Sequence, residues 1–215
     1  MRTPKERLFQ AAATGNVIAA KRALTDGTDV NGKDDHKRTP LHWAVRGGHV
    51  EVARLLIEKG ADFNAKDELQ QTPLHWVVES GSTDIALLLI ENGAKVNAKD
   101  DQQRTPLHWA AMSDHTDLAR LLIEKRAKVD AWDVDWRTPL HWAAMNGRTD
   151  IAHLLIEKGA HFCGHDKDRY TPLDWATQNG HTDTVEMLTN ANKPMTHAAR
   201  EARRRESNIY KELDV

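Results

Sequence analysis

The sequence predicts an all-α solenoid in which short helix–turn–helix units stack side by side and each projects a turn. The first observation behind this prediction is a phrase, Thr-Pro-Leu-His-Trp, that recurs at a constant interval of 33 residues, with Asp174 replacing the histidine in the fifth copy. The second is that every copy leads into another apolar stretch with helical spacing. A fixed period of this length is typical of stacked repeats. The tryptophan of the phrase stands at Trp43, Trp76, Trp109, Trp142 and Trp175.

Each phrase predicts the start of a short helix. The threonine hydroxyl can cap free backbone amides, and proline at the first helical position gives up no donor that the helix needs. We expect these first helices to end near glycines that can adopt a positive φ, such as Gly48, Gly81 and Gly147.

A second helix and a polar turn complete each unit. In residues 50–59 the apolar side chains of Val52, Ala53, Leu56 and Ile57 recur at helical spacing, which predicts one buried stripe. Glycine ends this helix at Gly60, and a polar, extended turn leads to the next threonine. Two short helices and a turn cannot bury their apolar surfaces alone, so neighbouring units must stack.

The unit resembles the ankyrin repeat over roughly residues 5–190. The resemblance rests on the Thr-Pro-Leu-His helix start, the paired leucines of the second helix and the Gly-Ala-x-Val/Phe-Asn-Ala-x-Asp turn. It implies a row of projecting β-turn fingers beside a concave surface made by the first helices, where partners dock. It also implies that the repeated histidines brace the turns through hydrogen bonds; these are His42, His75, His108 and His141.

We expect six repeats and a tail. The expected boundaries are 1–38 for an N-terminal capping repeat, 39–71, 72–104, 105–137 and 138–170 for four full repeats, 171–193 for a C-terminal capping repeat and 194–215 for a charged tail with a helical pattern.

Composition excludes several classes of protein. The 30 basic and 32 acidic residues give a formal charge of −2, so there is no general field to attract nucleic acid or an anionic membrane. No stretch approaches the ~20 apolar residues that span a bilayer, and the charged start at residues 1–7 argues against a secretory signal. The single cysteine, Cys163, permits no internal disulfide, which fits a reducing compartment. We expect a cytoplasmic protein, with the nucleus as the alternative.

No catalytic motif accompanies the repeats. The sequence has no phosphate-binding glycine loop, no G-x-S-x-G elbow and no H-E-x-x-H helix. His161, Cys163 and His165 alternate within one turn, but a closed zinc site needs four ligands. We therefore expect no catalytic residue, no cofactor and no metal. An enzyme that uses these three residues is the alternative.

The fourth repeat departs most from the pattern. Asp114 and Arg126 stand where the other repeats have glycine at a helix end, at a cost on the order of 1 kcal/mol per site, and less for aspartate. The following finger has Trp132 and Trp136 where other fingers have mostly lysine, glutamine or arginine. A solvent-facing finger has no structural need for indoles, although they could also fold down and pack on neighbouring fingers.

These departures predict a partner-binding patch. Tryptophan and arginine are favoured at interfaces, and methionine adapts its shape to a partner. The predicted site comprises Trp132, Trp136, Met112 and Met145, bordered by Arg104, Arg137 and Asp135.

The function predicted is a non-catalytic intracellular adaptor or scaffold that binds a protein partner through its fingers and concave surface. We expect a monomer that takes no small-molecule substrate and binds neither nucleic acid nor membrane directly. Two alternatives remain. The glycine-free fingertips and Leu173-Asp174 are similar to the beta subunit of GA-binding protein, a transcriptional co-regulator that binds a DNA-binding protein. The patch could instead serve self-association.

Overall fold

The computed structural model of the protein describes residues 3–192. The predicted tail at 194–215 lies outside the described residues. Within residues 3–192 there are twelve α-helices and no strands, which confirms the all-α prediction.

The helices form six pairs along the chain. The first helices of the pairs are α1 (Pro4–Thr14), α3 (Pro40–Arg46), α5 (Pro73–Ser80), α7 (Pro106–Met112), α9 (Pro139–Met145) and α11 (Pro172–Gln178). The second helices are α2 (Val17–Thr25), α4 (Val50–Glu58), α6 (Thr83–Glu91), α8 (Thr116–Glu124), α10 (Thr149–Glu157) and α12 (Thr182–Asn192).

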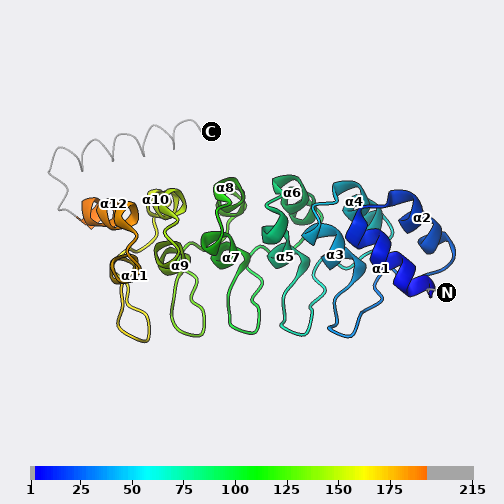
Figure 1. Cartoon of the computed structure of the whole chain (residues 1–215), viewed down its shortest axis with the longest axis horizontal. Coiled ribbons are helices and arrows are strands. Elements are labelled where there is room, and N and C mark those ends of the chain that lie inside the picture. The colour runs from blue at the N-terminus through cyan, green and yellow to red at the C-terminus, as the bar shows by residue number, and fades with distance from the viewer. Residues whose placement is uncertain (1–2, 193–215) are drawn as a thin grey trace.

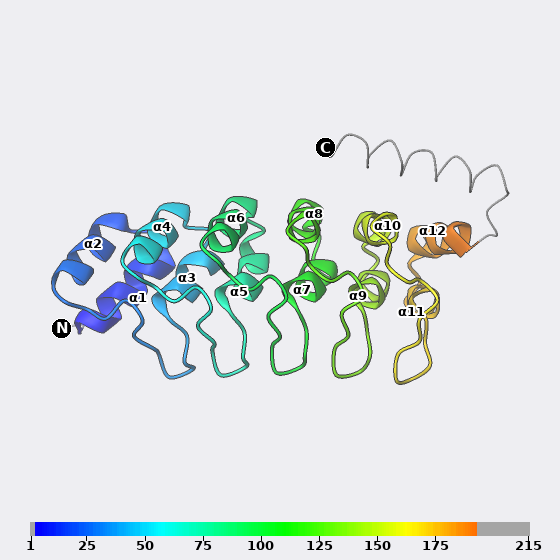
Figure 2. The same ribbon diagram turned by 180° about the vertical axis from the view of Figure 1, so that it is seen from behind.

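The pairs stand side by side in one row, with α1 and α2 at one end and α11 and α12 at the other (Figure 1). In the pairs from α3/α4 onward, the first helices lie nearer the row of long loops that hang from the array, and the second helices form the layer above them (Figures 1 and 2). These loops are the fingers that the sequence predicted.

The core is one continuous stripe between the two layers. The first helices contribute a leucine that is fully buried at the same place in successive repeats: Leu41, Leu74, Leu107 and Leu140. The second helices contribute Leu56, Leu89, Leu122 and Leu155 in the same way, each with no exposed surface. Each unit therefore buries its apolar surface against its neighbours as well as between its own two helices.

Threonine and histidine cap the internal first helices together, because each pair forms a capping box. In α5 the backbone N–H of Thr72 donates to His75 Nδ1 at 3.1 Å, and α3, α7 and α9 start in the same way. At the terminal repeats an acidic residue takes the place of the histidine, and the hydroxyls of Thr3 and Thr171 accept from backbone amides at 3.2 Å. The ring therefore accompanies the predicted threonine cap, since it accepts from the amide of the threonine itself.

The two glycine replacements in the fourth repeat behave differently. Arg126 adopts φ 69°, the left-handed conformation that Gly93 has in the preceding repeat, so the predicted strain is present there. The prediction for Asp114 is wrong, because Asp114 is not among the described residues with positive φ. Instead, Ser113 leaves α7 in an extended conformation, and its hydroxyl donates to the carbonyl of Trp109 at 3.2 Å.

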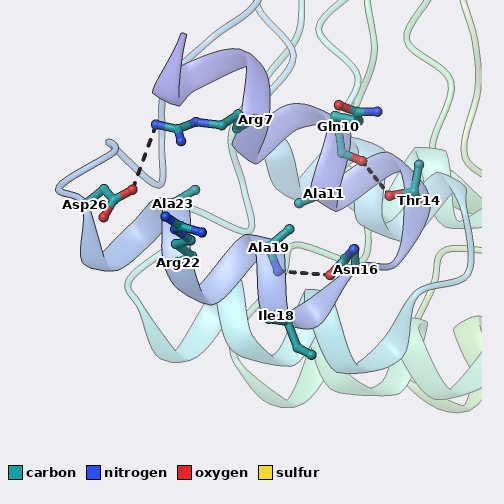
Figure 3. A pocket seen from close by; sticks show the side chains of 10 residues that line it. All are labelled: Arg7, Gln10, Ala11, Thr14, Asn16, Ile18, Ala19, Arg22, Ala23 and Asp26. Atoms are coloured by element: carbon teal, nitrogen blue, oxygen red, sulfur yellow. Dashed lines mark hydrogen bonds and ion pairs between the residues drawn. The ribbon is translucent and has the colours of Figure 1, made fainter. Parts of the chain in front are cut away.

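The N-terminal end is closed by polar side chains around a shallow hollow between α1 and α2 (Figure 3). Arg7 lies 3.9 Å from Asp26 there, and Arg22 occupies the place that the buried Leu55 has one repeat later. Ile18 is the apolar exception, with 82% of its surface exposed. Polar side chains on the outer surface of a repeat are typical of the end of an array.

Candidate functional site

An aspartate, buried in four of the five fingers, fixes each finger to its first helix. The Asp100 side chain has no exposed surface. Its Oδ1 accepts the backbone N–H groups of Gln102 (2.9 Å) and Arg104 (2.8 Å), which shapes the fingertip. Its Oδ2 accepts the indole N–H of Trp109 at 3.1 Å and the Nε–H of Arg104 at 2.9 Å. One carboxylate thus joins the finger, its arginine and the helix.

All five fingers repeat this indole–aspartate bond. The pairs, each nine residues apart, are Trp43 with Asp34, Trp76 with Asp67, Trp109 with Asp100, Trp142 with Asp133 and Trp175 with Asp166, at 2.8–3.2 Å. These bonds were not among the predictions made from the sequence. The signal was visible, because an aspartate precedes every repeat tryptophan by the same interval.

The hydrogen bonds lower the pKa of two of these carboxyl groups. Burial tends to raise the pKa of Asp34, but the hydrogen bonds from Arg38 and Trp43 outweigh it and lower the pKa. The pKa of Asp166 is lowered in the same way, since hydrogen bonds from Trp175, Tyr170 and Arg137 outweigh its burial.

The histidines link each repeat to the next. Because His75 Nδ1 accepts from Thr72, the proton lies on Nε2, which donates to the carbonyl of Arg104 at 3.1 Å. His42 and His108 make the equivalent bonds to Gln71 and Arg137 at 3.3 and 3.1 Å. The bracing role that the resemblance implied is therefore present in these three repeats.

Burial also keeps these rings neutral. It lowers the pKa of His42 and of His108 to about 4, and it lowers the pKa of His75 and His141 as well. His141 Nε2 is buried and has no hydrogen-bond partner among residues 3–192. A neutral, buried ring with both nitrogens engaged, as in the first three, is a structural element rather than an acid or base.

Backbone hydrogen bonds connect one finger to the next. The amides of Glu68, Asp101, Val134 and Lys167 donate to carbonyls of the preceding finger, each at 3.0 Å; the acceptors are His36, Leu69, Gln102 and Asp135. The fingers therefore form one braced row, whose surface needs little ordering when a partner binds.

Arginines stack on the tryptophans beside the first helices. The guanidinium carbon of Arg38 lies 4.6 Å from the Trp43 ring centre, and that of Arg104 lies 4.8 Å from the Trp109 ring centre. Arg137 lies 5.1 Å from Trp175. Two neighbouring indoles also contact each other: the ring centres of Trp43 and Trp76 are 6.1 Å apart.

The charged residues of the predicted site are already engaged. Arg104 is held by Asp100, and Arg137 lies 3.3 Å from Asp166 and 3.6 Å from Asp135. The structure thus brings Arg137 and Asp135 together, with the arginine side chain only 17% exposed. The two methionines, Met112 and Met145, are the last residues of α7 and α9 and are half-buried.

The two finger tryptophans lie in solvent. Trp132 is 62% exposed and Trp136 is 55% exposed. Their counterparts Lys66 and Gln70 contact each other across their finger, Nζ to Oε1 at 3.4 Å, so these two positions share one side. Residues next to them in the chain bind toward the first helix, as Asp133 does through Trp142. Since neighbours along an extended segment alternate, we infer that the indole pair Trp132/Trp136 faces the other side of the finger.

Trp136 stabilises the folded chain less than a glycine at the same position would. Its φ of 63° is in the left-handed region, where a Cβ is unfavourable. We expect Trp136→Gly to raise the free energy of unfolding by about 1 kcal/mol. Gln70→Gly, with φ 60° in another finger, should give a similar gain in the same urea titration. A loss of stability in Trp136→Gly alone would show that the indole packs on its surroundings.

The alternating histidines and cysteine do not assemble a metal site in the described part of the chain. Within residues 3–192, no three or more His, Cys, Asp or Glu side chains gather so that they could hold a metal ion. His161 Nδ1 instead lies 2.6 Å from Asp130 Oδ2 of the preceding repeat, and Cys163 is exposed.

Comparison with known proteins decides the family. A family model described as ankyrin repeats (3 copies) matches residues 4–67. A second, described as ankyrin repeats (many copies), matches residues 47–90, 75–116, 107–156 and 140–189. The chain belongs to the ankyrin repeat family. The comparison with curated proteins gives no match.

A solved structure agrees with this assignment. The chain is similar to the human ASB11 ankyrin repeat domain, with 30% identity and a TM-score of 0.79 over 92% of this chain and 89% of that one. The predicted fold and family are thus confirmed. Ankyrin repeats are generally non-catalytic modules for protein–protein interaction. In the described residues, no helix is both long and apolar enough to cross a membrane.

Proposed function

We propose that this ankyrin repeat chain is an adaptor that binds a protein partner through its fingers, with the indole pair as the anchor. The observation that carries the proposal is the exposure of Trp132 and Trp136 together in one finger. The other large apolar side chains exposed in residues 3–192, Ile18, Leu69 and Tyr170, stand singly in separate repeats. Large apolar side chains exposed next to one another are typical of protein interfaces, and tryptophan is among the residues most enriched at binding hot spots.

The scaffold supports this use of the indoles. The finger that carries them is braced by Asp133, which binds Trp142 at 2.9 Å, and by its amide bond from Val134 to Gln102. A partner would therefore meet a surface that is already ordered. The remaining residues of the proposed site, Met112, Met145, Arg104, Arg137 and Asp135, would contact a partner that reaches the concave surface.

A quantitative pull-down with Trp132→Ala/Trp136→Ala tests the proposal. We expect the double variant to retain its fold by circular dichroism and to capture the partner at least about tenfold less well, as loss of an anchor implies. Ile18→Ala removes an exposed apolar side chain at the end of the array, away from the fingers, and serves as the control. Equal capture by all three proteins would contradict the proposal. Sedimentation at several concentrations distinguishes partner binding from self-association, because we expect the chain alone to remain a monomer.

A further inference from the structure

One side of the finger row carries exposed cations on both sides of the indole pair. Each finger contributes two residues. One precedes the aspartate that binds the indole, and the other lies three positions after that aspartate. These pairs are Lys33/Lys37, Lys66/Gln70, Lys99/Gln103, Trp132/Trp136 and His165/Arg169, and all ten residues are exposed. None is acidic. We call these ten residues the finger flank.

The residues of the flank lie side by side. Within a finger, Lys99 Nζ donates to Gln103 Oε1 at 3.2 Å, as Lys66 does to Gln70. Between fingers, Lys66 Nζ also donates to the backbone carbonyl of Lys99 at 3.3 Å. These bonds join the second and third fingers, and the other flank residues stand at the equivalent positions of the repeat. We therefore treat the flank as one surface that crosses the repeats.

The charges of the flank are not neutralised. Lys33, Lys37, Lys66, Lys99 and Arg169 have no ion-pair partner among residues 3–192. On the helix-facing side of the same fingers the arginines are paired, as Arg38 is with Asp34 at 2.8 Å. Because the whole chain has a formal charge of −2, this row of unpaired cations does not reflect a general excess of positive charge.

Backbone strain at the fingertips is a second observation that points to a binding surface. Every fingertip places a residue other than glycine in the left-handed region: Lys37, Gln70, Gln103, Trp136 and Arg169, with φ between 60° and 65°. Each costs on the order of 1 kcal/mol relative to glycine. Strain kept in all five fingers indicates that their long side chains serve a contact outside the chain.

The geometry points to an extended acidic peptide as the occupant, and we propose that the flank binds such a segment of the partner. Packed helices lie about 8–10 Å apart, which sets the interval between fingers. A peptide in the extended polyproline II conformation advances about 3.1 Å per residue with three residues per turn, so every third side chain points the same way and meets a new finger. Carboxylates spaced by three would face successive cations, and one apolar residue would lie on the indole pair. This inference rests on the proposed function and names the chemistry of its partner.

The same observations disfavour single-stranded nucleic acid. Such sites place aromatic side chains under successive bases, whereas both indoles of the flank lie in one finger. The flank has one arginine, although arginine matches phosphate geometry better than lysine. Exposed carboxylates at the fingertips, among them Asp35, Asp101 and Asp168, border the flank and would repel a continuous polyanion.

Fluorescence anisotropy at low salt tests the inference. The probe is a peptide of about 15 residues with five positions spaced by three, a length that spans the five fingers. Phenylalanine stands at the fourth of these positions, to face the indole pair in the fourth finger, and glutamate stands at the other four. The test variant is Lys37→Glu/Lys66→Glu/Lys99→Glu. The control, Lys21→Glu/Lys59→Glu/Lys125→Glu, makes the same change of charge at three exposed lysines on or beside the second helices.

We expect the test variant to bind the peptide at least about tenfold more weakly than the control, and Trp132→Ala/Trp136→Ala to weaken it as well. The inference is overturned by three results: no binding of the peptide to the wild type, equal binding by both triple variants, or tighter binding of a thymidine oligonucleotide than of the peptide. If partner capture depends on the indoles but not on the lysines, the proposed function stands and this inference fails. If capture depends on neither, both fail.

Discussion

Replacing Asp100 by alanine is expected to lower the free energy of unfolding by about 3–5 kcal/mol, as removal of one partner from a buried charged network does. The substitution leaves the indole N–H of Trp109, the guanidinium of Arg104 and two backbone amides without their acceptor. This is a large part of the 5–15 kcal/mol that stabilises an ordinary domain. Urea titration followed by tryptophan fluorescence measures the change.

Asp101 provides the matched control for this prediction. It is the next residue in the chain and is exposed, and its backbone amide, which donates to Leu69, survives substitution. We expect Asp101→Ala to change stability by no more than about 0.5 kcal/mol. Similar losses in the two variants would mean that the indole–aspartate bond is not what holds the finger.

The second large effect is a loss of stability in mild acid. The pKa of His42 and of His108 is about 4 in the folded chain, because burial disfavours the charged ring, against 6.5 when exposed. Between these values the unfolded chain binds more protons, so stability is complete above about pH 6.5 and falls as the pH drops toward 4. Each ring should cost on the order of 3 kcal/mol at pH 4.

Urea titrations at pH 7.5, 5.5 and 4.5 measure this slope. His42→Gln/His108→Gln should be less stable at pH 7.5 but less sensitive to acid, whereas His153→Gln/His165→Gln, at exposed positions, should keep the wild-type slope. A wild-type stability that is flat from pH 7.5 to 4.5 would contradict the prediction. Asp34, Asp166 and Asp174 act in a separate window, since their lowered pKa values remove stability only as the pH falls below about 4.

The fold could be predicted because the repeat encodes it many times. A period of 33 residues, a proline at the start of each first helix and an apolar stripe in each second helix all indicate the same stack. The failures were local. Asp114 was expected to accept the conformation of glycine, but the chain avoided the strain by ending α7 at Ser113. Such a change depends on the neighbouring hydroxyl and carbonyls, which a comparison of aligned residues does not reveal.

The site could be predicted only in part, because sequence shows which residues differ but not which way they face. The exposure of Trp132 and Trp136 agrees with the reasoning from their polar counterparts. The engagement of Arg104 and Arg137 by buried aspartates was missed, since the indole–aspartate bond that organises the finger had not been recognised. The cationic flank was hidden for a similar reason: its residues are four apart in each finger and 33 apart along the row.

Indole ¹H–¹⁵N spectra with and without the captured partner test directly whether Trp132 and Trp136 anchor the partner. The chain has seven indole N–H groups, of which five donate to the finger aspartates. We expect the partner to shift or broaden the signals of Trp132 and Trp136, assigned through single substitutions, and to leave the other five largely in place. Perturbation of the five bonded indoles with the Trp132 and Trp136 signals unchanged would contradict it, and would place the partner on the concave surface instead.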